Sequence, residues 1–400
     1  MMGFSFLAGI VLGCLTIARL GDVYGRKPIF RLGLIMHLVL MITVTFLTTQ
    51  SILVLYVLLV LFGMSVTARY YVGYSYNIEM QPLYAWAFVS TFMFLAESLV
   101  YILVCFYFMF ISKNWVYVQV PNIALTVLGI CFLTKMPESP KFLLSQGKTK
   151  EATEVLKKIA EINGHHPEWF DNVELSLARP GSHTSMAAPT AESSGKGLDL
   201  SELQKNKTLK SNLFGCIIIF SMNAFNFYLL TFFMKYFPGS IFSNALAFAF
   251  SDVVAFILSG FMVSRMSIKY TYKIAFIVSF TGGVLFIFFE TIFALVLSGA
   301  NMTVIVAIMA CLCRMGGTMA FNIGYISVPR LFPIKFQSTV YAIVNFSAHI
   351  VACLAPLLAE IPSPIPFVGF LAAIGVSALF LKTLSELEQQ KEVWVQEKDL

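Results

Sequence analysis

The sequence predicts an all-α membrane protein with two sets of spanning helices. Hydrophobic residues make up 58% of the chain and charged residues 12%, whereas soluble domains carry about 25% charged residues. Long apolar segments recur along most of the chain, and helices are one of the two structures that satisfy backbone polar groups in lipid. A charged segment, 135–211, divides these apolar segments into two sets.

Eleven apolar segments are long enough to span a bilayer, which takes about 20 residues for a hydrocarbon core of ~30 Å. They lie near 3–20, 29–48, 51–72, 84–110, 115–134, 212–233, 241–263, 274–298, 302–328, 337–358 and 364–382. Five precede the charged segment and six follow it. The uneven split predicts a six-plus-six arrangement that lacks its first span, so that eleven of twelve spans are present.

The positions of Lys and Arg predict the orientation of these spans. If residues 135–211 lie in the cytoplasm, the loops on the opposite side carry only Lys113 and Lys235. The cytoplasmic loops carry Arg19, Arg26, Lys27, Arg31, Arg265, Lys269, Lys273, Arg330 and Lys335. The asymmetry holds for every loop, and it places the C-terminal tail in the cytoplasm as well. We expect the plasma membrane as the location.

The chain therefore divides into four predicted parts. They are an N-terminal bundle at 1–134, a cytoplasmic loop at 135–211, a C-terminal bundle at 212–382 and a cytoplasmic tail at 383–400. Within the loop, residues 179–197 are rich in Ser, Ala, Gly and Pro without periodicity. This composition is typical of a flexible linker.

Two short helices are expected at the start of the cytoplasmic loop. Ser139 followed by Pro140 is a helix start, with Ser as N-cap and Pro at the first helical position. Gly147 ends this helix, and Thr149 is placed to cap a second one that stops at Asn163. Apolar residues at helical spacing in the second helix predict an amphipathic element lying against an apolar surface.

Composition excludes several classes of function. The seven cysteines all fall inside apolar runs, so we expect neither a disulfide framework nor a metal site. The net charge of +6 comes without a clustered basic face, so nucleic acid is not an expected partner. No nucleophile, metal cluster or nucleotide-binding loop is present, and we therefore expect no enzyme activity and no cofactor.

A charged turn joins the first two apolar segments. Residues 18–28 read ARLGDVYGRKP. Gly25 permits a sharp turn, and the Asp22 carboxylate is suited to accept from a helix start or from an arginine. With Arg26 and Lys27 following, this loop resembles the signature loop of the major facilitator superfamily. Ordinary positive-inside anchoring is the alternative interpretation.

A second motif supports the same resemblance. Residues 137–148 read PESPKFLLSQGK, which resembles the Pro-Glu-Ser-Pro-Arg-Trp-Leu motif after the sixth span of sugar porters and of the organic cation/anion/zwitterion transporter family. Lys141 and Phe142 stand where Arg and Trp are usual. The segments at 73–79, 114–122, 314–320 and 331–333 are similar to the organic-ion branch, whereas the sugar porters' Pro-Glu-Thr-Lys-Gly motif after the last span is absent.

The resemblance implies the major facilitator fold, in which two pseudo-symmetric helical bundles enclose a site near the middle of the membrane and expose it alternately. It also implies a cytoplasmic lock between helices. On this chain the matching positions are Asp22, Gly25, Arg26, Lys27, Glu79, Glu138 and Lys141. The second signature loop is reduced to SRMSIK at 264–269, which predicts a weaker lock in the C-terminal bundle.

Ionisable residues inside the spans are candidate functional groups, because each is costly in lipid unless it is paired or hydrated. Arg314 lies near the middle of its span and needs an acidic partner, for which Asp252 is the best candidate. By the resemblance both line the central cavity. Glu97 is a further candidate, and for Glu290 we favour a position near the aqueous end of its span.

By the resemblance, His349 stands at a position where the family's cation carriers have an aspartate and its anion carriers have an arginine. A histidine changes charge near physiological pH, so we predict that uptake depends on pH through this residue. A packed, hydrogen-bonded histidine is the alternative.

Three aromatic residues, Tyr70, Phe227 and Tyr228, are placed by the resemblance on the cavity wall. Aromatic faces suit organic ions, including cations by cation–π attraction. For each single aromatic residue, packing is the alternative.

The sequence therefore predicts a carrier of small organic ions, either facilitative or coupled to an ion such as the proton. Its partners would be the solute and the lipid bilayer. Two alternatives stay open: a porter of sugars or other neutral solutes with the same fold, and a non-transporting sensor or decayed carrier.

Overall fold

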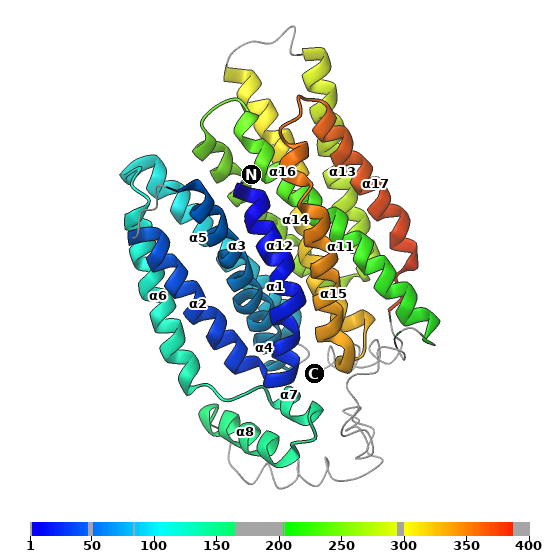
Figure 1. Ribbon diagram of the computed structural model, residues 1–400. Helices are drawn as coiled ribbons and strands as arrows, with labels where there is room; N and C mark the ends of the chain where they lie inside the picture. The colour runs from blue at the N-terminus through cyan, green and yellow to red at the C-terminus, as the bar shows by residue number, and fades with distance from the viewer. Residues whose placement is uncertain are drawn as a thin grey trace.

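The computed structural model describes residues 2–46, 51–82, 85–164, 203, 205–293 and 300–386, with a few side chains inside these ranges left out. Its long helices stand side by side in two groups (Figure 1). We call α1 to α6 the N-terminal half and α11 to α17 the C-terminal half. The predicted linker at 179–197 and most of the tail at 383–400 lie outside the described residues.

The N-terminal half contains five long helical segments, two of which include a stretch of π-helix. Its elements are α1 (Met2–Tyr24), α2 (Arg26–Phe46), α3 (Ile52–Val66), η1 (Thr67–Val72), α4 (Gly73–Glu79), α5 (Trp86–Phe106), η3 (Tyr107–Ile111) and α6 (Val116–Lys135). The elements α3, η1 and α4 follow one another without a break, so the predicted span at 51–72 continues to Glu79.

The described part of the C-terminal half consists of α-helices and two short 3₁₀-helices, η5 and η6. Its elements are α11 (Lys207–Phe233), η5 (Met234–Tyr236), α12 (Ile241–Arg265), α13 (Ile268–Phe293), α14 (Ala300–Leu331), α15 (Ile334–Ala352), α16 (Ala355–Leu358), α17 (Ile365–Phe380) and η6 (Leu381–Thr383). The predicted span at 337–358 is interrupted after α15, where Cys353 and Leu354 separate it from α16.

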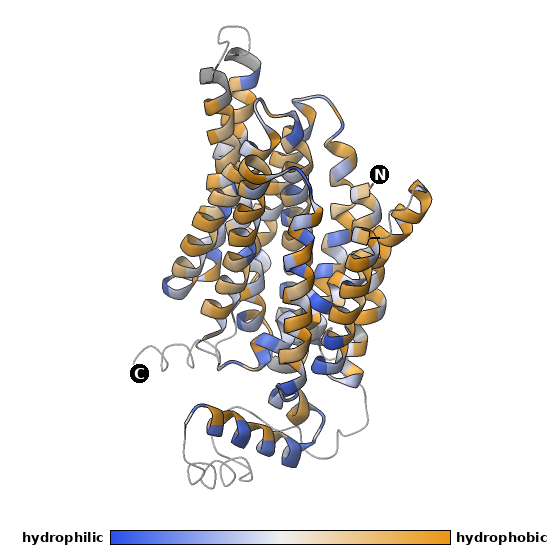
Figure 2. Cartoon of the chain, turned by 90° about the vertical axis from the view of Figure 1, so that its left-hand side faces the viewer, coloured by the Kyte–Doolittle hydropathy of each residue, from blue (hydrophilic) through white to orange (hydrophobic). Residues whose placement is uncertain are grey.

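Ten helices in the described part of the chain are long and apolar enough to cross a membrane. They correspond to the predicted segments from 29–48 to 364–382. The first predicted segment, 3–20, falls in α1, whose apolar stretch Met2–Ile17 is shorter. Figure 2 colours most of the length of the spans as hydrophobic.

Both short helices predicted at the start of the loop are present, as α7 (Pro140–Ser145) and α8 (Thr149–Ile162). The Ser139 hydroxyl accepts from the Phe142 N–H, as its predicted N-cap role requires. The second cap prediction was wrong: Lys148 is the N-cap residue of α8, and Thr149 is its first helical residue. Figure 2 shows α8 with one apolar and one polar face, lying across the end of the bundle.

Small residues set the closest helix contacts. A Cβ on Gly9 of α1 would lie 2.1 Å from the Val60 carbonyl oxygen of α3, and one on Gly63 would lie 2.2 Å from the Phe6 carbonyl oxygen. These two glycines therefore let the backbones of α1 and α3 touch, as small residues do in membrane bundles.

The two halves meet along α5 and α12. The rings of Phe94 and Phe256 stack with centroids 5.4 Å apart. Gly260 lies against Thr91, whose Oγ1 would be 2.6 Å from an added Cβ. Asn322 of α14 also donates to the Thr91 hydroxyl at 3.4 Å. The two halves are therefore packed closely along this seam.

Candidate functional site

The clearest polar feature inside the spans is an ion pair between α14 and α12. Arg314 Nε lies 2.9 Å from Asp252 Oδ1, and Arg314 Nη2 lies 2.9 Å from Asp252 Oδ2. Both residues are buried, with exposed fractions of 5% and 4%. The predicted pairing of Arg314 with Asp252 is therefore confirmed, and its geometry is the bidentate fork that guanidinium and carboxylate favour.

The remaining polar atoms of this pair are also satisfied. Thr318 donates to Asp252 Oδ1 at 2.5 Å. Arg314 Nη1 donates to the Thr231 hydroxyl at 2.8 Å and to the Phe227 carbonyl oxygen at 3.1 Å. Buried charges persist only when they are paired and hydrogen-bonded. The pair is thus a closed, electrically neutral unit.

Phe227 of α11 forms the aromatic wall of this unit. The Arg314 guanidinium carbon lies 3.6 Å from the centre of the Phe227 ring, a cation–π contact at close range. Tyr228 follows on α11, with its ring 5.7 Å from that of Phe227 and at a steep angle to it.

His349 of α15 joins the two halves. Its Nδ1 lies 2.8 Å from the Asn345 carbonyl oxygen, which accepts only, so Nδ1 is the donor. Its Nε2 lies 3.1 Å from the Tyr71 hydroxyl of η1. A neutral imidazole satisfies both contacts, with Nε2 accepting from Tyr71. The predicted pH effect through His349 stays a prediction.

Glu97 of α5 and Tyr70 of η1 form the second polar unit. The Tyr70 hydroxyl donates to Glu97 Oε2 at 3.2 Å. Protein surrounds the carboxyl on most sides, yet the residue keeps an exposed surface. It lies near the middle of the 26-residue span from Trp86 to Ile111. Glu97 thus differs from Asp252, which is fully enclosed by its partners.

Tyr71 connects these units into one constellation. Its ring lies 5.7 Å from the Tyr70 ring and 5.9 Å from the His349 imidazole. The Tyr228 ring lies 6.0 Å from the same imidazole on the C-terminal side. All seven residues predicted to bind substrate therefore lie along one run of contacts. Their role in binding stays a prediction.

An aromatic cluster lies between this constellation and the end of the bundle that carries α7. We define the inner aromatic cluster as Tyr74, Phe94, Phe256, Phe321, Tyr325 and Tyr341. The Tyr74 ring of the N-terminal half lies 5.2 Å from Tyr325 and 5.6 Å from Tyr341 of the C-terminal half. Because Tyr74, Tyr325 and Tyr341 are buried, the two halves are in tight contact at this level.

The predicted lock residues gather around α7. Glu138 accepts from the Lys27 backbone N–H at 3.1 and 3.2 Å and from the Ser139 N–H at 2.9 Å. Gly25 has a φ of +109°, and a Cβ there would lie 2.5 Å from Glu138 Oε2. Only glycine fits this turn, because the backbone is left-handed and the carboxylate fills the space.

The other lock residues complete the same assembly. Arg26 Nε lies 3.1 Å from Glu79 Oε1. Lys141 Nζ donates to the Gln81 carbonyl oxygen at 2.7 Å and lies 4.6 Å from the centre of the Trp86 ring. The Arg26–Glu79 contact joins α2 to α4, and the Lys141 contacts join α7 to Gln81 and to Trp86 of α5. The Asp22 side chain lies outside the described residues, and the lock itself stays a prediction.

Lys141 gives a testable pH dependence. Burial lowers the pKa of its ammonium group from 10.5 to about 8, and the Glu79 carboxylate offsets part of this effect. Between these pH values the unfolded chain binds more protons, so stability should rise with pH from about 8 to 10.5. In Lys141→Met this rise in thermal midpoint should disappear. Lys150→Met on exposed α8 should keep it, and an unchanged slope in Lys141→Met would contradict the assignment.

Sequence reasoning missed three members of the site. Thr318 is four residues after Arg314, and Thr231 is four residues after Phe227. Each threonine therefore lies on the same helix face as the earlier residue. Helical spacing was therefore a usable signal for these two. Tyr71 had no such signal, because its direction depends on the π-helical turn η1, which an α-helical pattern does not contain.

Glu290 lies apart from the constellation. It accepts a short hydrogen bond from Ser363, in the connection before α17.

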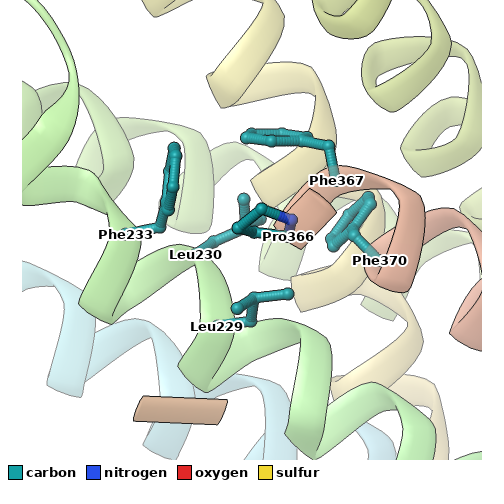
Figure 3. A pocket seen from close by; sticks show the side chains of 6 residues that line it. All are labelled: Leu229, Leu230, Phe233, Pro366, Phe367 and Phe370. Atoms are coloured by element: carbon teal, nitrogen blue, oxygen red, sulfur yellow. The ribbon is translucent and has the colours of Figure 1, made fainter. Parts of the chain in front are cut away.

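An apolar space also lies apart from the constellation. It has a volume of about 140 Å³ and lies between α11 and α17, lined by Leu229, Leu230, Phe233, Pro366, Phe367 and Phe370 (Figure 3). It is too narrow to admit water and has an apolar lining, so it does not suit an ionic solute.

Comparisons with known proteins agree with this architecture. The family model described as "Sugar (and other) transporter" matches residues 1–382. The fold is similar to the solved structure of the proton:xylose symporter XylE, with a TM-score of 0.70 and 14% sequence identity. The superposition includes 98% of this chain and 88% of the XylE chain. At that identity the likeness concerns the fold alone.

Several relatives in sequence have names that include solute carrier family 22 or organic cation/carnitine transport. The chain is 21% identical to solute carrier family 22 member 21 of Mus musculus and 22% identical to organic cation/carnitine transporter 2 of Rattus norvegicus, each over 88% of the chain. It spans 59% of the length of each. It is 24% identical to a solute carrier family 22 member 15-like protein of Xenopus laevis, over 97% of the chain and 76% of that protein.

Proposed function

The chain belongs to the sugar (and other) transporter family and has the major facilitator fold, and from this premise we propose that it carries small organic cations across a membrane by alternating access. The central segment and the C-terminal tail would lie in the cytoplasm, most simply at the plasma membrane. One relative is named organic cation/carnitine transporter 2, and this name supports the class of solute.

The distribution of charge is the observation that carries this proposal. Asp252 and Arg314 neutralise each other, and His349 fits its contacts as a neutral ring. Glu97 accepts one hydrogen bond, from Tyr70, and keeps an exposed surface. The Arg69 charge lies within range of it, but the two residues form no ion pair in the described structure. A carboxylate at this depth is costly against acyl chains. It therefore suits a space that holds water or a cationic solute.

Aromatic rings around Glu97 favour an organic cation over a metal ion. Tyr70 lies against Phe94, with ring centroids 6.3 Å apart, and it meets Tyr71 edge to face. Ring faces attract alkylammonium groups, and the attraction grows when water is excluded. The site would thus hold a cation by one carboxylate and several rings.

Alternating access would act through the contacts between the halves. The seam of α5 and α12, where Thr91 meets Gly260, would serve as the pivot. The inner aromatic cluster would close the α7 side, and its rings would separate for release on that side. The Tyr71–His349 hydrogen bond would break in the same movement. A coupling ion, such as the proton, is compatible with this scheme.

The test is uptake of four radiolabelled solutes: tetraethylammonium, para-aminohippurate, carnitine and glucose. Tetraethylammonium should enter saturably, and Glu97→Gln should lower its uptake roughly ten- to hundredfold, because a charge-assisted contact is lost. Glu154→Gln on the exposed side of α8 is the matched control and should behave as wild type. Equal uptake of the cation by Glu97→Gln and wild type would remove Glu97 from the site. Preference for glucose or para-aminohippurate would overturn the proposal.

A further inference from the structure

The two halves also touch at the end of the bundle opposite α7. There α5 passes into the π-helical turn η3, and a short connection leads into α6, which runs back to the α7 end (Figure 1). The Phe108 ring of η3 stacks on the Phe242 ring of α12, with centroids 5.7 Å apart and 23° between the planes. Phe242 lies in the first turn of α12. This contact therefore joins the two halves at the outer end of the α5–α12 seam.

A lysine adds a second contact between the same elements. The Lys113 ammonium nitrogen lies 4.0 Å from the centre of the Phe242 ring. It also donates to the Phe108 carbonyl oxygen at 2.6 Å. The ammonium is thus held by a ring of the C-terminal half and by a carbonyl group of the N-terminal half. Ring faces attract cations even at exposed sites, so the charge of Lys113 adds to the stacking of the two rings.

The connection from η3 to α6 holds Lys113 in place. We call residues 112–115 the strap. The Tyr107 hydroxyl donates to the Asn114 carbonyl oxygen at 2.8 Å, and the Asn114 N–H donates to the Ser112 hydroxyl at 3.1 Å. These bonds fix the residues on both sides of Lys113. Less conformational entropy is therefore lost when the lysine side chain makes its contact.

Lys235, the other described lysine at this end, has its partners within one half. It pairs with Glu360 at 2.6 Å, and its ammonium lies 4.8 Å from the centre of the Tyr236 ring. Both partners belong to the C-terminal half. What distinguishes Lys113 is therefore neither its charge nor an aromatic neighbour, which Lys235 has as well, but a partner in the other half.

We propose that the strap is a latch for the end of the bundle opposite α7. The Lys113 ammonium on the Phe242 ring holds the halves together there, and release of this contact lets that end open. The inference rests on the alternating access of the proposed function and adds a regulating contact to it. The contact suits repeated opening, because Lys113 is exposed and because the N-terminal end of α12 disfavours a nearby cation.

Removing the latch should shift the protein toward a state that is open at this end. Lys113→Met keeps a long side chain and loses the charge. The open population should then rise about two- to fivefold, the ratio that corresponds to an exposed cation–π contact. Phe242→Leu also loses the stacking on Phe108 and should have a larger effect. Lys113→Arg should keep most of the latch, because a guanidinium also binds ring faces.

The distance between spin labels on the two halves measures this shift. Ile111 of η3 and Ile241 of α12 are both exposed, and cysteines at these positions carry the labels. Cys131, the exposed native cysteine, is replaced by serine in every variant. Pulsed electron paramagnetic resonance on the purified full-length protein should show a longer distance gaining population in Lys113→Met.

The matched control is Lys235→Met. It removes the same charge at the same end, from beside a ring of its own half. The distribution of label distances should stay as in the wild type. Lys113→Arg should also stay close to the wild type, which would separate the loss of the cation from the mere change of side chain.

Uptake is a second readout. The predicted orientation places this end outside the cell, so a larger open population should bind external solute with higher apparent affinity. The half-saturating concentration of external tetraethylammonium should therefore fall about two- to fivefold in Lys113→Met. In Lys235→Met it should stay unchanged.

The outcomes separate the latch from the proposed function. Wild-type distances in both Lys113→Met and Phe242→Leu would overturn the latch, and continued uptake of tetraethylammonium would leave the function intact. Equal lengthening in Lys235→Met would also overturn the latch, since surface charge in general would then be the cause. If the distances change as expected and no cation is carried, the latch stands and the proposed solute class fails.

Discussion

Arg314→Gln is expected to abolish uptake and to destabilise the C-terminal half by about 3–5 kcal/mol, the usual effect of breaking a buried ion pair. The substitution leaves the Asp252 carboxylate with only the Thr318 hydroxyl among its present partners. An uncompensated carboxylate with an exposed fraction of 4% will bind a proton or draw in water. Either response rearranges α12 against α14 beside the predicted site.

The reciprocal change tests whether the two charges act as a unit. Asp252→Asn should also abolish uptake, because it leaves the Arg314 guanidinium without its counter-charge. The double variant should be no worse than either single variant, since the pair contributes only once. Uptake per molecule at the cell surface and the thermal midpoint of purified protein are the two measurements. Losses that add in the double variant would contradict the pairing as the source of the effect.

Glu138→Ala should lower uptake at least about tenfold while reducing surface expression much less. Glu138 accepts from the backbone of Lys27 in the first turn of α2 and from Ser139 at the start of α7. Two backbone N–H groups donate to this carboxylate and hold the turn at Gly25 near the start of α7. Leaving a buried donor unbonded costs about 1–3 kcal/mol. The helices would remain, but their ends would no longer move together.

The controls for Glu138 separate charge from shape. Glu138→Gln keeps one acceptor oxygen of similar reach and should lose less than the alanine variant. Glu151→Gln on α8, where the native residue makes only an exposed ion pair with Lys148, should match wild type, because such pairs contribute little. Parallel loss of expression and uptake in Glu138→Ala would mean that the residue serves folding alone.

Much of the fold follows from local sequence properties. Apolar length placed ten candidate spans close to their observed ranges, because a bilayer demands about 20 apolar residues regardless of their neighbours. The Ser139 cap and the sharp turn at Gly25 were also local predictions, and both are present. The Asp252–Arg314 pair was predicted from a single argument, the cost of a lone charge in lipid.

The same argument could not predict the contacts or the exposure of the other ionisable residues in the spans. Arg69, Glu97 and His349 are equally ionisable in the sequence, yet they end in three different states. His349 is satisfied by Asn345 and Tyr71, Glu97 keeps an exposed surface, and Arg69 has a buried, unbonded nitrogen. Which of these arises depends on the rotation of each helix about its axis, and neighbouring helices set that rotation.

The amino-acid sequence by itself determined the solvent, the number and length of most spans, the turn at Gly25 and the start of α7. Each of these depends on residues close together in the chain and on the energetic demands of lipid. The tertiary structure decided that η1 is π-helical, that Tyr71 reaches His349 across the two halves, and that Glu97 and Arg69 stay unpaired with each other. These contacts join residues as far as 278 positions apart. No local pattern encodes the Tyr71–His349 contact, because it arises only when both halves pack together, and the states of Glu97 and Arg69 depend on how neighbouring helices of one half pack.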